Sequence, residues 1–401
     1  MDNSRFDKDR SPGQLVETEI WVDEVRGGVP QKVPVRGTAF VPNPLPPPLD
    51  WSAVCGRLTG RLLEAQSNIS RLDGLASRLP NPHLLLRPLL VREAMTSSEI
   101  EDIKTSMLGI ALERAGARVE NEQNNRLVLN YVAALDNGLD SQYPIGHKLV
   151  HDLHRILLSG VEGSDRRPGS YRDRQNMIGR DGAQLSDARF VPPPPGAPLE
   201  DRMNNLLQFM REPPDNIPAL VATAIGHYQF EAIHPYEDGN GRVGRLLISL
   251  CLCRYGLLAQ PLGYVSGYFE RHRREYYDAL LAVSTNGEWE NWIDLFLRAV
   301  ASETKAAASQ ADRLFVLWRT LSDKVGTRRT SVLQRTLIDH LFDRPVVTVS
   351  QVCEVLDITD TAARRHISQL VELGVLTPDT KFRHPQIYVC GPIVELANRN
   401  E

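Results

Sequence analysis

The spacing of apolar residues along the chain predicts a mainly helical protein. From Trp51 to Leu79, apolar residues recur every three or four positions, which is the pattern of one long amphipathic helix, and Pro80 and Pro82 end it. The same spacing predicts further helices over residues 124–135, 146–158, 199–210, 217–230, 246–257, 273–283, 289–301 and 303–324.

Patterns typical of strands occupy two stretches before the C-terminal part. Residues 15–40 alternate apolar and polar side chains, which predicts a short hairpin, and the proline-rich residues 41–49 predict an extended connector. Residues 168–191, with a turn at 180–182, predict an exposed hairpin that has one free edge. The polar and charged residues 1–14 are expected to be disordered.

Residues 330–394 form a pattern of their own, which is typical of a winged helix-turn-helix domain. The second of its two central helices would expose Thr361, Arg364, Arg365 and Gln369. The elements expected, in order, are a helix over 333–342, a strand over 346–349, a helix capped by Ser350 and ending at Leu356, a helix over 361–373, and an alternating stretch over 376–389 with a polar tip.

The charge of this C-terminal unit bears on its partners. From Gly326 to Glu401, nine Lys and Arg balance nine Asp and Glu, whereas DNA-binding domains are usually basic. DNA binding is therefore weakly supported, and contact with a protein or packing in a dimer is the favoured alternative.

Composition narrows the class of protein. A chain of 401 residues, 42% of them hydrophobic, is long enough for two or three domains, and a net charge of -4 implies no polyanionic partner for the whole chain. No apolar run is long enough to span a membrane, and the first residues are unlike a signal peptide. The five cysteines are scattered, which favours reduced thiols and a cytoplasmic location.

The candidate chemistry is concentrated between His234 and Arg245, in the sequence HPYEDGNGRVGR. Pro235 cannot continue the helix before it, and Gly239 and Gly241 suit a sharp loop that approaches a ligand closely. A helix that begins near 240–242 offers unpaired N–H groups and the positive end of its dipole to an anion.

Charged side chains beside this helix start indicate a polyphosphate. Arg242 and Arg245 lie three positions apart, so both can fork onto phosphate oxygens. Asp238 suits Mg²⁺, the cation that a carboxylate and phosphate oxygens commonly share. His234 is the nearby group that can accept a proton near neutral pH. Taken singly, each residue also fits an ordinary turn or surface role.

This stretch resembles the signature of the Fic family, His-Pro-Phe-x-(Asp/Glu)-Gly-Asn-Gly-Arg-x-x-Arg, with Tyr236 in place of Phe. The resemblance implies a Fic-type helical bundle that transfers AMP from ATP to a hydroxyl side chain of a protein. His234 would be the catalytic base and Asp238 the Mg²⁺ ligand. Nucleotide contacts would come from Pro235, Asn240, Gly241, Arg242, Val243, Gly244, Arg245 and Leu246, and from Tyr277 against the adenine.

A second stretch contains Ser97, Glu101 and Asp102. From the residues alone, Ser98-x-x-Glu101 favours a capping box that opens a helix. The resemblance instead implies an inhibitory motif, (Ser/Thr)-x-x-x-Glu-(Gly/Asn), whose Glu101 would pair with Arg245 and occupy the place of the ATP γ-phosphate. Asp102 departs from the Gly or Asn of that motif.

The resemblance also implies a role for the hairpin at 168–191. It would be the flap whose free edge holds the target's main chain as an added strand, with Asn176, Met177 and Ile178 at the contact. The partners implied are ATP, Mg²⁺, a target protein with a Tyr, Thr or Ser hydroxyl, and a second copy of the chain in a homodimer. Another nucleotide donor such as UTP is also possible, because contacts with the phosphates do not distinguish the base.

Two other functions stay open. In one, Glu101 activates water and the protein mainly removes AMP from its target. In the other, the chain is a nucleotide-sensing transcriptional regulator.

The chain is expected to divide into five parts. They are an N-terminal arm with the connector (1–49), N-terminal helices with the inhibitory motif (50–118), the Fic catalytic core (119–304), a connecting helix or linker (305–329) and the winged helix (330–401).

Overall fold

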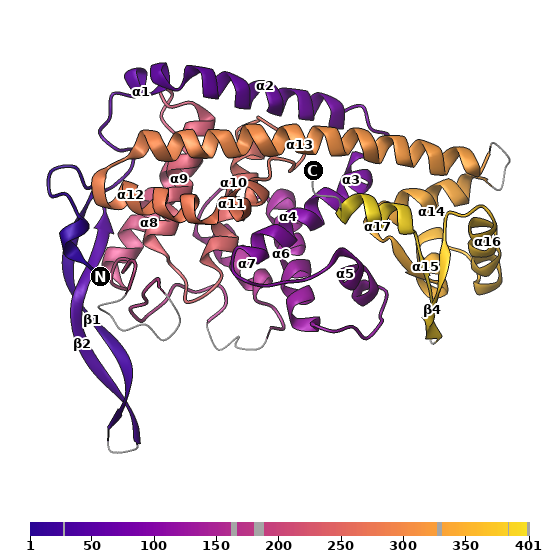
Figure 1. The fold of residues 1–401 in the computed structure, drawn as a ribbon, viewed down its shortest axis with the longest axis horizontal. Helices are drawn as coiled ribbons and strands as arrows, with labels where there is room; N and C mark the ends of the chain where they lie inside the picture. Colours follow the sequence, from indigo (N-terminus) through magenta and orange to yellow (C-terminus); the bar gives the residue numbers. More distant parts are fainter. Residues whose placement is uncertain (27–28, 162–166, 180–187, 327–330, 384, 399–401) are drawn as a thin grey trace.

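The computed structural model describes residues 1–26, 29–161, 167–179, 188–326, 331–383 and 385–398, and it is mainly helical as predicted. One long helix, α13 (Trp289–Lys324), runs along the molecule, and α2 (Thr59–Ala76) lies beside it on the outer side (Figure 1). The remaining helices of the N-terminal three quarters of the chain lie beneath α13. They are α3 (Pro82–Leu85), α4 (Arg87–Glu99), α5 (Met107–Arg114), α6 (Glu122–Asp140), α7 (His147–Leu157), α8 (Ala197–Arg211), α9 (Ala219–Ile233), α10 (Asn240–Arg254), α11 (Ser266–Arg271) and α12 (Arg273–Asn286).

The helix predicted over 51–79 is two helices, α1 (Trp51–Arg57) and α2, so this prediction is wrong in one respect. Leu58 sits at the junction with φ -95° and ψ 6°, and its side chain is buried. Because apolar residues keep their helical spacing across Leu58, the pattern does not reveal the break. Arg57 pairs with Glu290 and Arg61 with Asp294, so both helices are tied to α13.

The two helices predicted over 289–301 and 303–324 are the single helix α13, so the prediction of two separate helices is wrong. Neither Gly nor Pro stands between the two stretches, so nothing in the backbone ends the first helix. Thr304 donates a hydrogen bond to the Val300 carbonyl (2.6 Å) within this helix and is buried.

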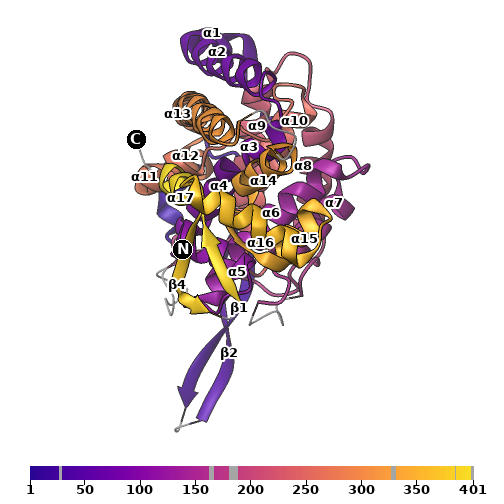
Figure 2. The ribbon, with the colours of Figure 1, turned by 90° about the vertical axis from the view of Figure 1, so that its right-hand side faces the viewer.

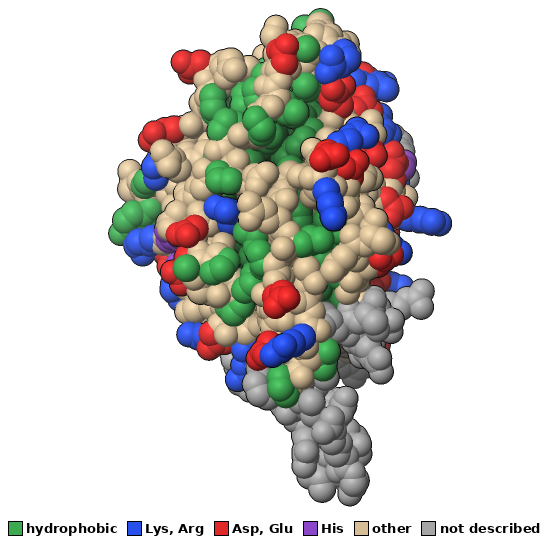
Figure 3. Space-filling view, turned by 90° about the vertical axis from the view of Figure 1, so that its left-hand side faces the viewer, with side chains coloured by type: hydrophobic (Ala, Val, Ile, Leu, Met, Phe, Trp, Pro, Cys, Tyr) green, Lys and Arg blue, Asp and Glu red, His purple; other side chains and the backbone are tan. Residues whose placement is uncertain are grey.

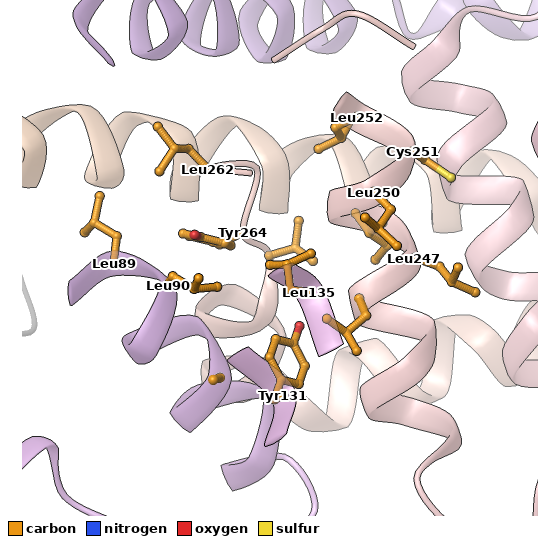
Figure 4. Packing of buried hydrophobic residues seen from close by; sticks show 14 of the residues in the cluster. Leu89, Leu90, Tyr131, Leu135, Leu247, Leu250, Cys251, Leu252, Leu262 and Tyr264 are labelled. Atoms are coloured by element: carbon orange, nitrogen blue, oxygen red, sulfur yellow. The ribbon is translucent and has the colours of Figure 1, made fainter. Parts of the chain in front are cut away.

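The core that supports the candidate site lies between α4, α6 and α10. Leu89 and Leu90 of α4, Tyr131 and Leu135 of α6, and Leu250 of α10 meet there (Figure 4). Helix α9 is buried over almost its whole surface, in agreement with its nearly continuous apolar sequence. The loop that joins α9 to α10 is therefore held between two deeply buried helices.

The N-terminal arm is longer than the hairpin predicted over 15–40. Strands β1 (Gly13–Arg26) and β2 (Val29–Pro42) pair antiparallel from Gly13↔Pro42 to Arg26↔Val29, and the hairpin projects from the helical body (Figures 1 and 2).

The expectation of disorder over residues 1–14 is wrong. A short 3-10 helix, η1 (Asn3–Arg5), leads to Phe6, whose ring lies 5.4 Å from that of Phe40. The Asp7 N–H donates to the Thr285 carbonyl (2.9 Å). This polar segment is ordered by contacts with distant elements, which its own composition cannot reveal.

The C-terminal elements follow the predicted order. They are α14 (Ser331–Asp343), β3 (Val346–Thr348), α15 (Val349–Leu356), α16 (Asp360–Glu372), β4 (Thr377–Arg383) and β5 (Gln386–Val389), with the sheet order β3-β5-β4, and an unpredicted helix α17 (Gly391–Asn398). That these elements make a winged helix domain stays a prediction.

Two details of this unit differ from expectation. Thr348, rather than Ser350, caps α15, because its side chain and that of Gln351 exchange hydrogen bonds with each other's backbone. Gln369 accepts a hydrogen bond from Gln334 (2.7 Å) and is half-buried, whereas Thr361, Arg364 and Arg365 are exposed as predicted.

The C-terminal unit packs against the N-terminal helices instead of standing apart. Most of its buried hydrophobic residues belong to the same cluster as those of α4, α6 and α10, and Val346 and Ile387 form a smaller cluster with residues of α5. Asp343 pairs with Arg114 (3.0 Å) and Arg87 (3.3 Å), and Gln351 donates to the Arg114 carbonyl (2.8 Å). Figure 2 shows the unit at the end of α13.

The surface carries both signs of charge. On the face that Figure 3 shows, acidic and basic side chains are interspersed among polar and apolar ones. The five cysteines are all free thiols. Within the described residues, no helix has the length and apolar character that crossing a membrane requires.

Candidate active site

The loop between α9 and α10 has the conformation that its glycine and proline residues predict. Helix α9 ends at Ile233, and His234 caps it in the left-handed conformation (φ 49°), with its N–H donating to the Phe230 carbonyl (2.9 Å). Gly239 also has a positive φ (73°) and directly precedes the first residue of α10. The left-handed His234 is unusual for a residue with a Cβ, which indicates that its surroundings hold it there.

Hydrogen bonds from two buried side chains hold this loop. The Asn240 amide accepts from the Tyr236 N–H and donates to the Tyr236 carbonyl, both at 2.8 Å. Arg172 donates from Nε to the His234 carbonyl (2.9 Å) and from its backbone N–H to the Pro235 carbonyl (3.0 Å). No local pattern predicts this role of Arg172, because its partners are backbone carbonyls 62 and 63 positions away.

His154 of α7 fixes the far side of the loop. Its Nδ1 accepts a hydrogen bond from the Gly169 N–H (2.8 Å), so Nε2 carries the proton and donates to the Asp238 carbonyl (3.1 Å). Burial lowers the pKa of His154 to about 4, which keeps this tautomer neutral. Tyr236 stacks on the His154 ring, and its hydroxyl lies 3.0 Å from Nδ1 of His151. The tyrosine that replaces phenylalanine thus has a polar partner.

A cavity of about 1080 Å³ opens over this loop. Eight of the predicted site residues line this cavity. They are Glu101, Ile178, His234, Asp238, Asn240, Gly241, Arg245 and Tyr277. The residues predicted at the nucleotide that do not line it are Pro235, Arg242, Val243, Gly244 and Leu246. Val243 and Leu246 are fully buried, and the Val243 N–H donates to the Gly239 carbonyl (3.0 Å), so a direct nucleotide contact from Val243 is not supported.

Glu101 occupies the part of the cavity where the two motif arginines meet. Its Oε1 lies 2.9 Å from Nη2 of Arg245 and its Oε2 lies 2.6 Å from Nε of Arg242. Both arginine side chains are 2% exposed, whereas that of Glu101 is 24% exposed. A Cβ on Gly241 would lie 2.7 Å from Oε1 of Glu101 and from Nη1 of Arg245, so a larger residue there would displace the ends of these two side chains.

The turn that carries Glu101 follows α4 and does not open a helix, so the capping-box interpretation of Ser98 is wrong. Helix α4 ends at Glu99, the Ser98 hydroxyl donates to the Ala94 carbonyl (2.8 Å), and the next helix starts after Ser106. Ser97 is buried and accepts two hydrogen bonds from Arg245. Nε of Arg245 donates to the Ser97 hydroxyl (2.8 Å), and Nη2 of Arg245 donates to the Ser97 carbonyl (2.7 Å).

Comparison with known proteins agrees with this geometry. The profile described as Fic/DOC family N-terminal matches residues 59–140, and the profile described as Fic/DOC family matches residues 144–252. Residues 59–140 and 144–252 are therefore the two Fic/DOC family domains of this chain. The second match contains the whole loop from His234 to Arg245.

Two curated relatives carry the name of an activity. A protein of Aquifex aeolicus named probable protein adenylyltransferase is 36% identical over 194 residues, which is 48% of this chain and 54% of that protein. The protein adenylyltransferase Fic of Aedes aegypti is 30% identical over 164 residues, which is 39% of this chain and 27% of that protein. The chain thus spans about half or less of the length of these relatives.

A solved structure shares the fold. The Fic family protein from Desulfovibrio desulfuricans G20 superposes with a TM-score of 0.55 at 21% identity, over 83% of this chain and 95% of that one.

Within the hairpin predicted over 168–191, the described residues form a single β-bridge. The Ile178 N–H donates to the Phe190 carbonyl (2.8 Å) and the Phe190 N–H to the Ile178 carbonyl (3.1 Å). The turn predicted at 180–182 lies outside the described residues. Asn176 donates to the Tyr236 carbonyl (3.2 Å), and Met177 packs against the cluster that contains Ala39. Contact of residues 176–178 with a target stays a prediction.

Asp238, the expected Mg²⁺ ligand of the Fic loop, lies at the cavity with its side chain 37% exposed. Its Oδ1 accepts from the Gly239 N–H (2.7 Å) and lies 3.5 Å from Nη2 of Arg242. Among the described residues, no three His, Cys, Asp or Glu gather as a metal site. A single carboxylate fits Mg²⁺, which usually takes one or two carboxylates together with substrate phosphates and waters.

The electrostatics of the Fic loop suit a proton acceptor. Burial, and after it the charge of Arg172, lower the pKa of His234 to about 4. The imidazole is therefore neutral near pH 7. Burial acts against the charge of Arg245, yet Glu101 keeps the pKa of this arginine above its ordinary value.

The cavity includes groups that sequence reasoning missed. Burial raises the pKa of Glu231 to about 7, and its Oε1 has no hydrogen-bond partner among the described residues. Glu231 lies three positions before His234 and could have been found as the one acidic residue in an otherwise apolar helix face. Arg273 and Arg189 also line the cavity, and Tyr276, beside the predicted Tyr277, is buried with its hydroxyl 2.8 Å from His227.

Proposed function

We propose that this protein is a protein adenylyltransferase that moves AMP from ATP to a Tyr, Thr or Ser hydroxyl of a target protein, releases pyrophosphate, and is held inactive by Glu101. The observation that carries the proposal is the contact of one carboxylate with two buried arginines at the start of α10. The names of the curated relatives support the same reaction class.

The polyphosphate binds where Glu101 now lies. Arg242 and Arg245 together carry two positive charges in a buried setting, where Glu101 contacts both and Asp238 lies 3.5 Å from Nη2 of Arg242. Guanidinium groups bind phosphate oxygens in the same forked geometry as carboxylates. A triphosphate therefore competes directly with Glu101 for these two side chains.

Asp238 would hold Mg²⁺. The ion would supply positive charge beside the phosphate groups, which favours attack at phosphorus. The backbone N–H groups of the first turn of α10 stabilise charge that develops on the α-phosphate.

His234 accepts the proton of the target hydroxyl. The hydroxyl oxygen forms a bond to the α-phosphorus, and the bond from that phosphorus to the bridging oxygen of the β-phosphate breaks. Pyrophosphate leaves with the electron pair of the broken bond. Removal of such a base typically costs about 100- to 10,000-fold in rate.

Mass spectrometry of lysate proteins incubated with ATP tests the proposal. We expect peptides heavier by one adenylate with Glu101→Gly, few with the wild type, and none above background with Glu101→Gly/His234→Ala. Incubating the modified target again with wild type and Glu101→Gly separates addition of AMP from its removal. Absence of adenylated peptides with Glu101→Gly would contradict the proposal, and release of AMP by the wild type alone would favour the reverse reaction.

A further inference from the structure

We propose that Arg273 is a further phosphate-binding residue of this cavity and that Asp102 is a second blocking carboxylate, which holds Arg273 away from the nucleotide. The inference rests on the proposed function, because its ligand is the polyphosphate of the same nucleotide.

Arg273 is the first residue of α12 and lines the same cavity as Arg245. Its Nη1 lies 2.8 Å from Oδ1 of Asp102 and its Nη2 lies 3.0 Å from Oδ2, which is the two-pronged geometry that arginine also makes with phosphate. The carboxylate thus occupies the donors that a phosphate group would use.

The backbone at Asp102 shows what its carboxylate adds. Asp102 has a φ of 62°, in the left-handed region, where Gly and Asn are the residues most easily accommodated. Asparagine would hold this turn as well as aspartate does. The feature that aspartate adds is a full negative charge, and that charge meets Arg273.

Asp102 and Glu101 act from the same turn. The Glu101 N–H donates to the Ser98 carbonyl and the Asp102 N–H to the Glu99 carbonyl, both at 3.0 Å. The turn therefore presents two adjacent carboxylates to three arginines, those at 242, 245 and 273. Withdrawal of the turn would expose three positive charges to one polyphosphate.

Solvent exposure indicates which ion pair a nucleotide displaces more easily, that of Asp102 with Arg273 or that of Glu101 with Arg242 and Arg245. The side chains of Arg273 and Asp102 are 36% and 78% exposed, and exposed ion pairs contribute at most about 1 kcal/mol, a factor of roughly five in an equilibrium constant. The Glu101 contact, with arginines that are 2% exposed, is the stronger block. We infer that Asp102 adjusts nucleotide affinity and Glu101 determines whether the nucleotide binds productively.

The neighbouring Arg274 provides a matched control. Its side chain is 95% exposed, it pairs with Asp278 at 3.6 Å, and it does not line the cavity. Loss of charge at Arg274 therefore changes the net charge of the protein equally without removing a cavity donor.

Equilibrium dialysis with Mg-ATP, Mg-ADP and AMP on the full chain tests the inference. Relative to its parent, Asp102→Asn should bind Mg-ATP about two- to fivefold more tightly in the wild-type background. In the Glu101→Gly background, Arg273→Ala should weaken Mg-ATP binding several-fold, Arg273→Lys should restore part of the loss, and Arg274→Ala should have little effect. The loss of affinity caused by Arg273→Ala should be largest for Mg-ATP, smaller for Mg-ADP and smallest for AMP. In a protein that already carries Arg273→Ala, Asp102→Asn should not change the affinity for Mg-ATP.

Equal effects of Arg273→Ala and Arg274→Ala, or an unchanged affinity in Asp102→Asn, would overturn the inference while leaving the proposed function intact. If Glu101→Gly itself bound no Mg-ATP, the proposed function would fail, and this inference with it.

Discussion

Nη2 of Arg245 lies 2.9 Å from Oε1 of Glu101, although the two residues are 144 positions apart in the chain. The contact joins the turn after α4 to the second turn of α10, and the Ser97 hydroxyl and carbonyl complete the bonding of the same guanidinium. A nucleotide that needs Arg245 must therefore displace the Glu101 carboxylate from a buried arginine. In the proposed function, the cost of that displacement holds the protein inactive.

Replacing Glu101 by glutamine should destabilise the fold in the absence of nucleotide. The change removes the carboxylate that contacts both buried arginines and leaves Asp238, 3.5 Å from Arg242, as the nearby counter-charge, and breaking a buried ion pair on one side typically costs about 3–5 kcal/mol. Because Glu101 is partly exposed, we expect a loss of roughly 2–3 kcal/mol in the free energy of unfolding measured by urea denaturation. Saturating Mg-ATP should restore much of it by binding only the folded state. A variant as stable as the wild type would contradict the pairing.

The rate of AMP transfer should not fall until low pH, because His234 stays neutral and able to accept a proton. Since burial lowers the pKa of His234 to about 4, the imidazole of the free enzyme accepts a proton only below that value. In the Glu101→Gly protein, kcat/KM for the target should fall as the pH drops through about 4, with no decline near the ordinary histidine value of about 6.5. A pH–rate profile that declines at about 6.5 would show that His234 is more solvated than the structure indicates.

Glu231 should make the stability of the protein fall as the pH rises. Burial raises its pKa to about 7, so between its ordinary value and pH 7 the unfolded chain loses this proton while the folded protein keeps it. Stability from this group is complete below about pH 4.5 and is lost as the pH rises through about 7. Glu231→Gln should remove this dependence, which is on the order of 3 kcal/mol at most.

Urea denaturation from pH 4.5 to 8 measures that difference. Glu64→Gln, on the exposed face of α2, is the control and should run parallel to the wild type. Parallel curves for Glu231→Gln and the wild type would contradict the raised pKa of Glu231.

The sequence could predict the catalytic loop because its chemistry lies in one continuous stretch. The positive φ of Gly239 and the helix that begins at Asn240 follow from local signals of Pro, Gly and apolar spacing, whereas the left-handed conformation of His234 had no such signal. The resemblance to the Fic family supplied Glu101, whose pairing no local pattern encodes. From the residues alone, Ser98-x-x-Glu101 favoured a capping box, because that pattern describes a few neighbouring residues and not a partner far along the chain.

The features that could not be predicted depend on contacts between distant segments. Arg172 holds the carbonyls of His234 and Pro235, and Arg273 holds Asp102, across 171 positions in the second case. The continuity of α13 and the break at Leu58 were missed for the opposite reason, since apolar spacing is the same on both sides of each point. Hydrophobic periodicity places helices well and their ends less well.

The central claim is that Glu101 occupies the place of a nucleotide phosphate on Arg242 and Arg245. Calorimetric titration of Mg-ATP into the wild type, Glu101→Gly and Glu101→Gly/Arg245→Ala tests it most directly. The account predicts at least about tenfold tighter binding to Glu101→Gly than to the wild type, and loss of that gain in the double variant. Equal affinities of the wild type and Glu101→Gly, or no uptake of nucleotide by either, would contradict it.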